Sequence, residues 1–127
     1  MRFKLVVPLR GFEHLKEVEL HKIDDIFMKL DAVEDEHISF TLIDPFILRT
    51  YDFELPYNVR ELLEIKENSN VLIQNVVILQ QPIEESYVNF LSPILFNTDT
   101  QKAAQIILAE NTHYGVAEKI SDFLNTK

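Results

Sequence analysis

Residues 42–56 read LIDPFILRTYDFELP, and this stretch bears most directly on the fold. An Asp-Pro pair lies near its start, an apolar run follows, and Glu-Leu-Pro closes it. In its second half, Tyr51, Phe53 and Leu55 alternate with acidic residues, which is the period of a half-buried β-strand. Proline cannot donate to a strand ladder, so a strand bounded by prolines is expected at the edge of a sheet.

We therefore predict three parts within this stretch. Asp44-Pro45 ends one strand, the chain crosses the end of the sheet over Phe46 to Leu48, and an edge strand follows over 51–55.

Short segments with strand-like alternation, or rich in β-branched and aromatic residues, fill most of the remaining chain. They lie at 2–8, 15–23, 26–30, 38–43, 71–79, 87–97 and 101–108. Strands about ten residues apart are typical of an antiparallel meander or a small barrel. Val18 and Leu20 are predicted to face inward, Pro93 to mark an edge, a strand start or a bulge, and residues 98–100 to form a turn.

Two short helices complete the predicted fold. Asn58 and Glu61 have the spacing of a capping box at the start of the first. Near the C-terminus, apolar residues recur at helical spacing, namely Val116, Ile120, Phe123 and Leu124. The prediction is a mainly β protein: a small antiparallel β-barrel-like domain with one short internal helix and a C-terminal amphipathic helix. It forms a single domain over 1–127, with 115–127 as a C-terminal helical extension.

The composition is that of an ordinary soluble globular protein, with 46% hydrophobic and 26% charged residues among 127. Cysteine is absent, which excludes disulfides, thiolate zinc sites and a cysteine nucleophile. Only two glycines occur, so the glycine-rich phosphate loops of nucleotide-binding folds are absent. The first apolar run, LVVPL, is shorter than a secretory signal requires, and no run is long enough to span a membrane. We expect a cytoplasmic protein without a membrane contact.

The formal net charge is −9, which argues against direct binding of nucleic acid. Much of this charge is local, because residues 24–36 hold six acids and one lysine. Such a run is usually a solvated surface. The sharper interpretation is an acidic surface that meets a basic partner or repels RNA from it.

No pattern of catalytic, cofactor-binding or metal-binding residues stands out. The four histidines form no H-E-x-x-H motif, and the acidic run lacks the glycine at the sixth position of a calcium loop. No serine has the flanks of a nucleophile elbow. We therefore predict no enzyme, no cofactor and no metal. Triads assemble in space rather than in sequence, so a small-ligand-binding barrel or an enzyme that uses the histidines and the acidic run stays an alternative.

Three blocks of sequence resemble the bacterial flagellar assembly factor FliW family. The first is Gly11-Phe12-Glu13. The second comprises Phe40, Leu42, Asp44, Pro45, Phe46, Tyr51, Phe53, Leu55 and Pro56. The third comprises Asn89, Leu91, Ser92, Pro93, Ile94, Asn97 and Thr100, and Gln105, Ile107, Leu108 and Tyr114 continue it. Together the blocks span nearly the whole chain in the family's order.

Two features depart from the family. Its usual Leu-Pro-Gly-Phe is replaced by Leu9-Arg10-Gly11-Phe12, and residues 115–127 extend beyond the point where many members end. The resemblance implies a non-enzymatic protein that binds flagellin and the RNA-binding translational regulator CsrA in competition. When secretion drains flagellin, the factor antagonises CsrA and flagellin translation resumes. We expect a monomer when the protein is free.

On this basis we place the partner-binding surface along the predicted edge and the strand around Ser92-Pro93-Ile94. Its candidate residues are Asp44, Pro45, Phe46, Asp52, Glu54, Pro93, Asn97 and Thr100. Apolar members that face inward instead fill the barrel, and the polar members divide between turn formation and recognition.

Overall fold

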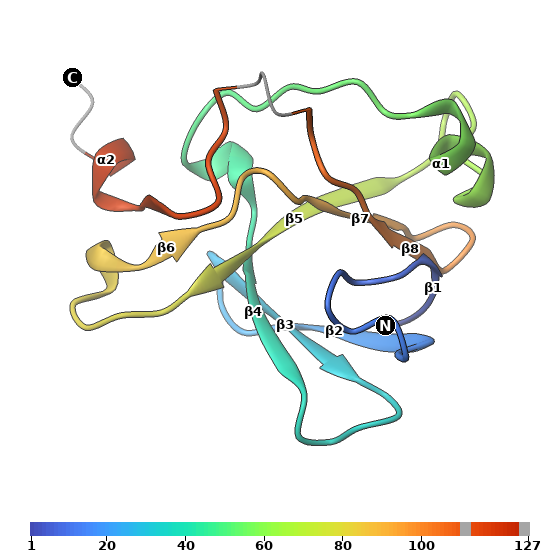
Figure 1. The fold of residues 1–127 in the computed structure, drawn as a ribbon, viewed down its shortest axis with the longest axis horizontal. Coiled ribbons are helices and arrows are strands. Elements are labelled where there is room, and N and C mark those ends of the chain that lie inside the picture. Colours follow the sequence, from blue (N-terminus) through green and yellow to red (C-terminus); the bar gives the residue numbers. More distant parts are fainter. Residues whose placement is uncertain (110–112, 125–127) are drawn as a thin grey trace.

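The fold is a closed β-barrel, seen in the computed structural model, which describes residues 1–109 and 113–124 (Figure 1). Its seven strands are β1 (Arg2–Val7), β2 (Glu17–Lys22), β3 (Phe27–Ala32), β4 (Ser39–Ile43), β5 (Val71–Ile78), β7 (Ile94–Asn97) and β8 (Lys102–Gln105). They pair in the order β4-β3-β2-β1-β8-β7-β5, and β5 pairs with β4 to close the ring. The predicted β-barrel is confirmed.

One pair of strands is parallel, so the barrel is not wholly antiparallel as predicted. β1 runs parallel to β8, with Leu5 opposite Ala103, and the register shifts before Val7. The other neighbours in the ring are antiparallel. The reason is geometric: strand direction cannot alternate all the way around a ring of seven, so one pair must run parallel.

The strand predicted over 87–97 is interrupted. It divides into β6 (Tyr87–Val88) and β7, both paired with β5. Residues 89–93 bulge between them, because the six steps from Val88 to Ile94 lie opposite only the three steps from Val77 to Gln74 in β5. Pro93 directly precedes β7, as predicted for a strand start.

The edge strand predicted over 51–55 is wrong. These residues run across the barrel without joining a sheet, and the crossing before them is a 3-10 helix, η1 (Pro45–Ile47). Asp44 starts this helix by accepting the Phe46 N–H at 2.9 Å. The alternation of residues 51–55 therefore predicts correctly which side chains share a face of an extended segment. It does not show whether a neighbouring strand pairs with that segment.

The internal helix α1 spans Tyr57–Leu62, but its predicted capping box is wrong. Asn58 lies inside the helix, and Pro56 occupies the N-cap position with no side-chain cap. Proline fits there because its fixed φ leads the chain into the first turn. At the other end Glu64 adopts a left-handed φ of 57°, and the Ile65 N–H bonds the Arg60 carbonyl at 3.0 Å.

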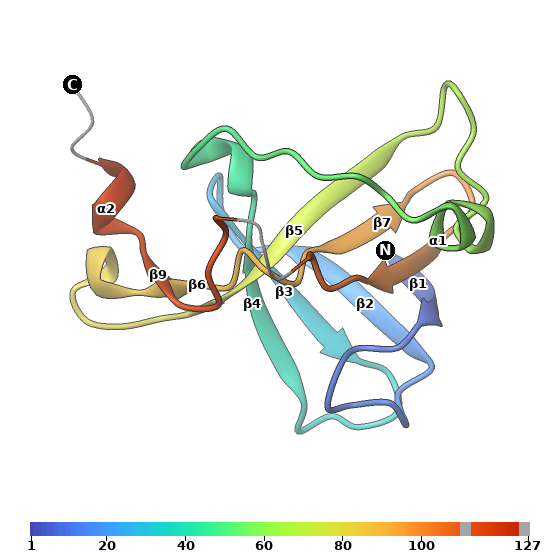
Figure 2. The same cartoon turned by 45° about the horizontal axis from the view of Figure 1, so that its top comes forward.

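The C-terminal helix is shorter than its apolar spacing predicts. Residues 118–119 instead form β9 (Glu118–Lys119), which pairs with β6 outside the barrel, and α2 covers only Ser121–Leu124. The predicted extension to 127 lies partly outside the described residues. A further 3-10 helix, η2 (Ile83–Glu85), precedes β6. In two views β6, β9 and α2 lie together at one end of the molecule and α1 at the other (Figures 1 and 2).

Several acids of the 24–36 run hold the turns of the β1–β4 meander. Asp24 accepts the N–H groups of Ile26 and Phe27, each at 2.8 Å. Glu34 accepts that of Lys16, also at 2.8 Å. These backbone bonds lower the pKa of the Asp24 and Glu34 carboxyls, against the opposing effect of burial at Glu34. The run therefore has a structural role that neither sequence interpretation anticipated.

The apolar core has two parts. One lies between β1–β4 and the facing residues of β7 and β8, where Phe3 and Phe96 meet edge to face with ring centroids 5.0 Å apart. Val18 and Leu20 point into it, as predicted. The other lies under residues 43–65 and the C-terminal segment, around Phe90 and Leu63. Both parts are filled by side chains: Phe3, Leu30 and Phe96 in the first, and Leu63 and Phe90 in the second, are each at most 1% exposed.

Candidate partner-binding surface

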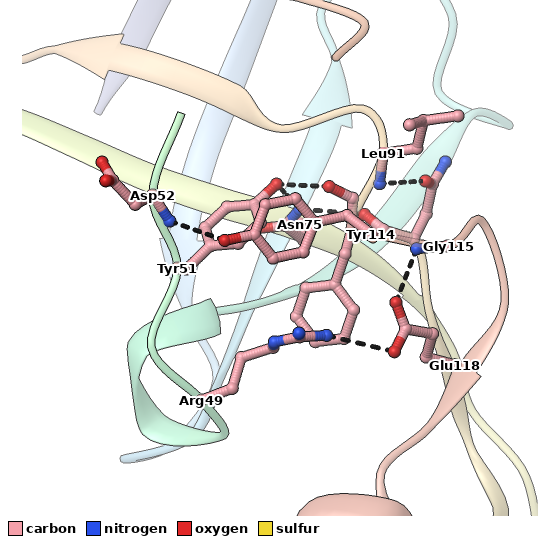
Figure 3. Close-up of polar contacts among 10 residues, drawn as sticks. Arg49, Tyr51, Asp52, Asn75, Leu91, Tyr114, Gly115 and Glu118 are labelled. Atoms are coloured by element: carbon pink, nitrogen blue, oxygen red, sulfur yellow. Dashed lines mark hydrogen bonds and ion pairs between the residues drawn. The ribbon is translucent and has the colours of Figure 1, made fainter. Parts of the chain in front are cut away.

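The segment that crosses the barrel is held by an arginine set among aromatic rings. The Arg49 guanidinium carbon lies 5.0 Å from the ring centroid of Phe90, 4.8 Å from Tyr114 and 5.1 Å from Phe123. Its Nη1 donates to Glu118 Oε1 at 3.1 Å, and the side chain is only 16% exposed (Figure 3). Cation–π and charge-assisted contacts gain strength when shielded from water. Arg49 therefore ties residues 44–56 to the C-terminal segment.

Tyr51 fixes the same segment from the inside. Its hydroxyl donates to the Phe90 carbonyl and accepts from Asn75 Nδ2 at 3.1 Å. The same Nδ2 donates to the Asn89 carbonyl at 2.8 Å. Burial raises the pKa of Tyr51 to about 12, so the phenol is neutral at physiological pH. Next along the chain, the Asp52 N–H donates to the Tyr114 hydroxyl at 2.9 Å (Figure 3).

Beyond Tyr51 the chain is extended and flanked by two hollows. On one side, residues 52–56 face residues 106–109 across a groove of about 470 Å³. On the other, Phe53 and Leu55 line a hollow of about 310 Å³ with Phe46 and residues of β5. Among the described residues, the backbone groups of Phe53, Glu54 and Leu55 form no hydrogen bond. Within the described residues, this extended backbone therefore keeps unused donors and acceptors.

The groove between 52–56 and 106–109 is apolar at its base and acidic at its rim. Phe53, Ile106 and Leu108 are buried or half-buried beneath it, and Ile107 is 47% exposed. Asp52 and Glu54 are exposed.

Three of the predicted site residues lie on this accessible surface: Phe46, Asp52 and Glu54. Phe46 is 54% exposed and stands edge to face with Tyr51, at 6.2 Å between centroids. Their role in recognition stays a prediction.

The remaining predicted residues are placed in structural roles. Asp44 caps η1, and Pro45 is buried in its first turn. Pro93 is buried, as are its neighbours Ser92 and Ile94 at 9% and 1% exposure, so the accessible surface does not include them.

Asn97 and Thr100 close the end of α1. Asn97 is fully buried and donates from Nδ2 to the Leu63 carbonyl at 2.8 Å. The Thr100 hydroxyl donates to the same carbonyl at 3.1 Å. A helix leaves its last carbonyls without partners inside the helix, and these two side chains both donate to the Leu63 carbonyl at the C-cap.

Sequence reasoning missed the residues that position the surface. The role of Arg49 was not predicted, because an arginine in an apolar run does not indicate that three aromatic rings from distant segments will surround it in the folded chain. Tyr114 and Ile107 appeared only as members of the third sequence block. The proximity of Tyr114 to Tyr51, with centroids 4.8 Å apart, arises only in the folded chain.

Two further kinds of feature bear on function in the described part of the chain: a cluster of metal ligands and a long apolar helix. No group of three or more His, Asp or Glu side chains is arranged around a cation site there. On the outside of the meander, His21 Nε2 lies 3.1 Å from Glu19 Oε1 and 3.3 Å from Asp31 Oδ2. Within the same residues, no helix has the length and apolar character needed to cross a bilayer.

These features define a class: a small closed β-barrel domain that carries an acid-rimmed groove between irregular segments. The FliW protein family model matches residues 2–120. A flagellar assembly factor FliW from Sulfurimonas denitrificans is 59% identical over 124 residues, 98% of each chain. The flagellar assembly factor FliW 2 of Wolinella succinogenes is 45% identical, over 99% of this chain and 94% of its own.

A solved structure agrees with these relatives. The crystal structure of a flagellar assembly factor FliW superimposes with a TM-score of 0.87 at 26% identity, covering 94% of this chain and 84% of the other. The chain therefore belongs to the FliW family of flagellar assembly factors. The family match reaches residue 120, so the first part of the segment 115–127 lies within the family region.

Proposed function

We propose that this protein is a non-enzymatic cytoplasmic regulator that binds flagellin and antagonises the translational regulator CsrA. Free flagellin occupies the protein. When flagellin is exported, the released protein binds CsrA and relieves repression of flagellin translation. The observation that carries the proposal is the full-length similarity to flagellar assembly factors, at 59% identity for one of them.

The groove supplies a receptor suited to such partners. Disordered segments that fold on binding need apolar contacts and main-chain partners. The groove offers both: an apolar base at Phe53 and Ile107, and the unpaired backbone of residues 53–55.

The charge supports antagonism of an RNA-binding protein. With a net charge of −9, the protein does not attract a phosphate backbone, but it complements a basic surface. Two partners exclude one another when they share a surface or require different conformations. One receptor surface is enough for the proposed competition.

The interior of the barrel gives little support to a small-ligand function. The core between β1–β4 and the facing strands is filled by Phe3, Leu30, Leu42 and Phe96, each at most 1% exposed. A lipocalin-like cavity requires an interior that is not filled in this way.

Calorimetric titration with CsrA, repeated after the protein is loaded with flagellin, tests the proposal. Binding to CsrA that flagellin abolishes supports the competition. Binding to flagellin alone retains a chaperone role and removes the translational one, and binding to neither overturns the proposal.

Mutation then tests whether the groove is the receptor. Glu54→Ala is expected to weaken partner binding without lowering the melting temperature, because Glu54 is exposed. Glu67→Ala is the matched control, since Glu67 is also an exposed glutamate but lies outside this groove. Unchanged affinity of Glu54→Ala would count against a role of Glu54 in recognition.

A further inference from the structure

The sheet continues beyond β8 on one side only. The N–H groups of Ile106 and Leu108 donate to the carbonyls of Pro93 and Leu91, at 3.1 and 2.8 Å. This is the register of the β7–β8 pair carried two steps further. Residues 106–108 therefore form a strand-like segment bonded along one edge.

The opposite edge of this segment is open. In an antiparallel ladder, alternate residues direct their N–H and C=O groups to opposite sides. Since Ile106 and Leu108 face residues 91–93, the N–H and C=O of Ile107 face away from them. Among the described residues Ile107 forms no hydrogen bond.

The neighbour that would cover this edge leaves the sheet before reaching it. β1 covers the same side of β8 as far as Val7 opposite Ala104. Pro8 follows and offers no N–H, and the chain then turns at Gly11, whose φ is +88°. Among the described residues, the one bond from this turn back to β8 runs from the Arg10 N–H to the Gln105 side chain, at 2.7 Å. The seam between β1 and β8 is therefore open beyond Gln105.

Two grooves meet at this open edge. Ile106 and Ile107 line the groove shared with residues 52–56, and they also line a groove of about 400 Å³ that includes Val7, Pro8 and Arg10. Ile107 is 47% exposed between them. Space, an apolar floor and free main-chain groups thus occur together, which is what an added strand requires.

The charges select among possible occupants. Exposed Asp52 and Glu54 rim one groove, and Glu13 accompanies Arg10 in the other. A second copy of this chain would bring the same acids and a net charge of −9 to the edge. A segment carrying basic side chains is favoured instead, because opposite charges attract and like charges repel across an interface.

We propose that the open edge of Ile106–Leu108 accepts an extended apolar segment of a partner protein as an additional β-strand, with a basic side chain of that segment paired to Asp52 or Glu54. This deepens the proposed function and rests on it only in requiring a protein partner. Main-chain bonds to Ile107 supply the alignment, and the acidic rim supplies the selectivity.

Two synthetic heptapeptides test the edge directly, Val-Lys-Val-Lys-Val-Lys-Val and its glutamate counterpart, each with blocked ends and a fluorescent label. Anisotropy at low salt is expected to show the lysine peptide binding about tenfold or more tightly than the glutamate peptide. Equal binding, or binding of neither, would overturn the proposal.

Charge reversal separates this rim from general attraction to an acidic protein. Glu54→Lys is expected to weaken the lysine peptide several-fold, whereas Glu67→Lys, with the same change of net charge, has little effect. An equal loss in both variants would show that the peptide responds only to total charge, and would overturn the assignment to this edge.

Amide hydrogen exchange resolved by residue gives the decisive measurement without a mutation. On saturation with the lysine peptide, exchange at Ile107 is expected to slow about tenfold, while Ile106 and Leu108 start already protected by their existing bonds. An unchanged Ile107 amide overturns the added strand. Because the probe is synthetic, this failure is distinct from that of the proposed function, which depends on flagellin and CsrA themselves.

A proline variant complements the exchange experiment. Ile107→Pro removes the outward N–H and is expected to abolish peptide binding with the circular dichroism spectrum retained, because no intramolecular bond uses that group. Ile107→Ala, which keeps the N–H, is expected to retain part of the affinity. Undiminished binding to the folded proline variant would contradict the proposal.

Discussion

Two regions of this molecule, which we call the meander half and the irregular half, satisfy their backbone groups in different ways. In the meander half, β1–β4, neighbouring strands pair in antiparallel ladders, and Phe3, Leu30 and Leu42 belong to one buried apolar cluster. Turn acids such as Asp24 accept the few N–H groups left at the loops.

The irregular half comprises residues 44–56, 89–93, 106–109 and 113–124. There the ladders end, and buried side chains such as Tyr51 and Asn75 take over the backbone groups. Arg49 joins three rings from separate segments. The difference teaches that a chain which departs from regular sheet needs buried polar groups, and that the same departure leaves edges open for a partner.

The largest effect is expected from removing apolar volume in the core part between β1–β4 and the facing residues of β7 and β8. Phe96→Ala should lower the free energy of unfolding by about 3–5 kcal/mol, because Phe96 is fully buried against Phe3. Phe46→Ala, at 54% exposure, should change it by no more than about 0.5 kcal/mol. Urea unfolding measures both, and similar losses would contradict the described packing.

The next largest effect is expected from the polar network of the irregular half. Tyr51→Phe should cost about 1–3 kcal/mol, since it leaves the buried Phe90 carbonyl without its hydroxyl partner. Tyr87→Phe is the matched control, because Tyr87 is only half-buried. Urea unfolding measures the free energy of unfolding of both variants. An equally small loss in both would show that the Tyr51 hydrogen bond does not stabilise the irregular half.

High pH sharpens the same test. The pKa of Tyr51 is raised in the folded state to about 12 by burial, above its ordinary value of 10.0. Its contribution is therefore complete below pH 10 and is lost as pH rises toward 12, because the unfolded chain releases the proton first. The stability difference between the natural protein and Tyr51→Phe should shrink across that window, and a constant difference would contradict the raised pKa.

A smaller and more local effect is expected at Arg49. Arg49→Lys should cost about 1 kcal/mol, because a lysine keeps the charge but loses the flat contact with the rings. Amide exchange should accelerate in residues 114–124 while the meander half is unaffected. Uniform acceleration throughout the chain would show that the two halves unfold as one unit.

The smallest effect is expected at Asp99, at the turn after β7. Its pKa is lowered by the backbone N–H of Asn70 and then by the Asn70 side chain. Its contribution is present above pH 3.8, the ordinary value, and is lost as pH falls through the folded pKa. Asp99→Asn should therefore destabilise slightly at pH 7 and not at all in acid. Urea unfolding at both pH values measures the effect, and Glu67→Gln, which removes another exposed carboxylate, is the control.

The meander half was the more predictable of the two. Its strands appeared in the sequence as alternating segments, and Val18 and Leu20 were correctly placed inside, because a paired strand with one buried face has a period of two. The same rule failed at 51–55, where the alternation is real but no neighbouring strand pairs with it. It also failed to show the interruption at 89–93, where the pairing with β5 changes register.

The candidate site was predictable only in part. Asp52 and Glu54 were identified as the outward members of an alternating segment, and they are exposed. Asn97 was a candidate for either turn formation or recognition, yet it is buried at the end of α1, because a polar residue in a strand looks the same in sequence whether it meets a partner or a helix carbonyl.

By itself, the sequence determined the mainly β class, the positions of most strands, the proline-marked breaks and the family resemblance. Each of these depends on residues close together in the chain or on motifs in order. Tertiary structure alone decided the parallel closure of β1 on β8, the aromatic setting of Arg49 and the open edge at Ile107. These depend on which distant segments become neighbours, because burial and hydrogen bonding across a closed barrel are set by pairs that sequence spacing does not encode.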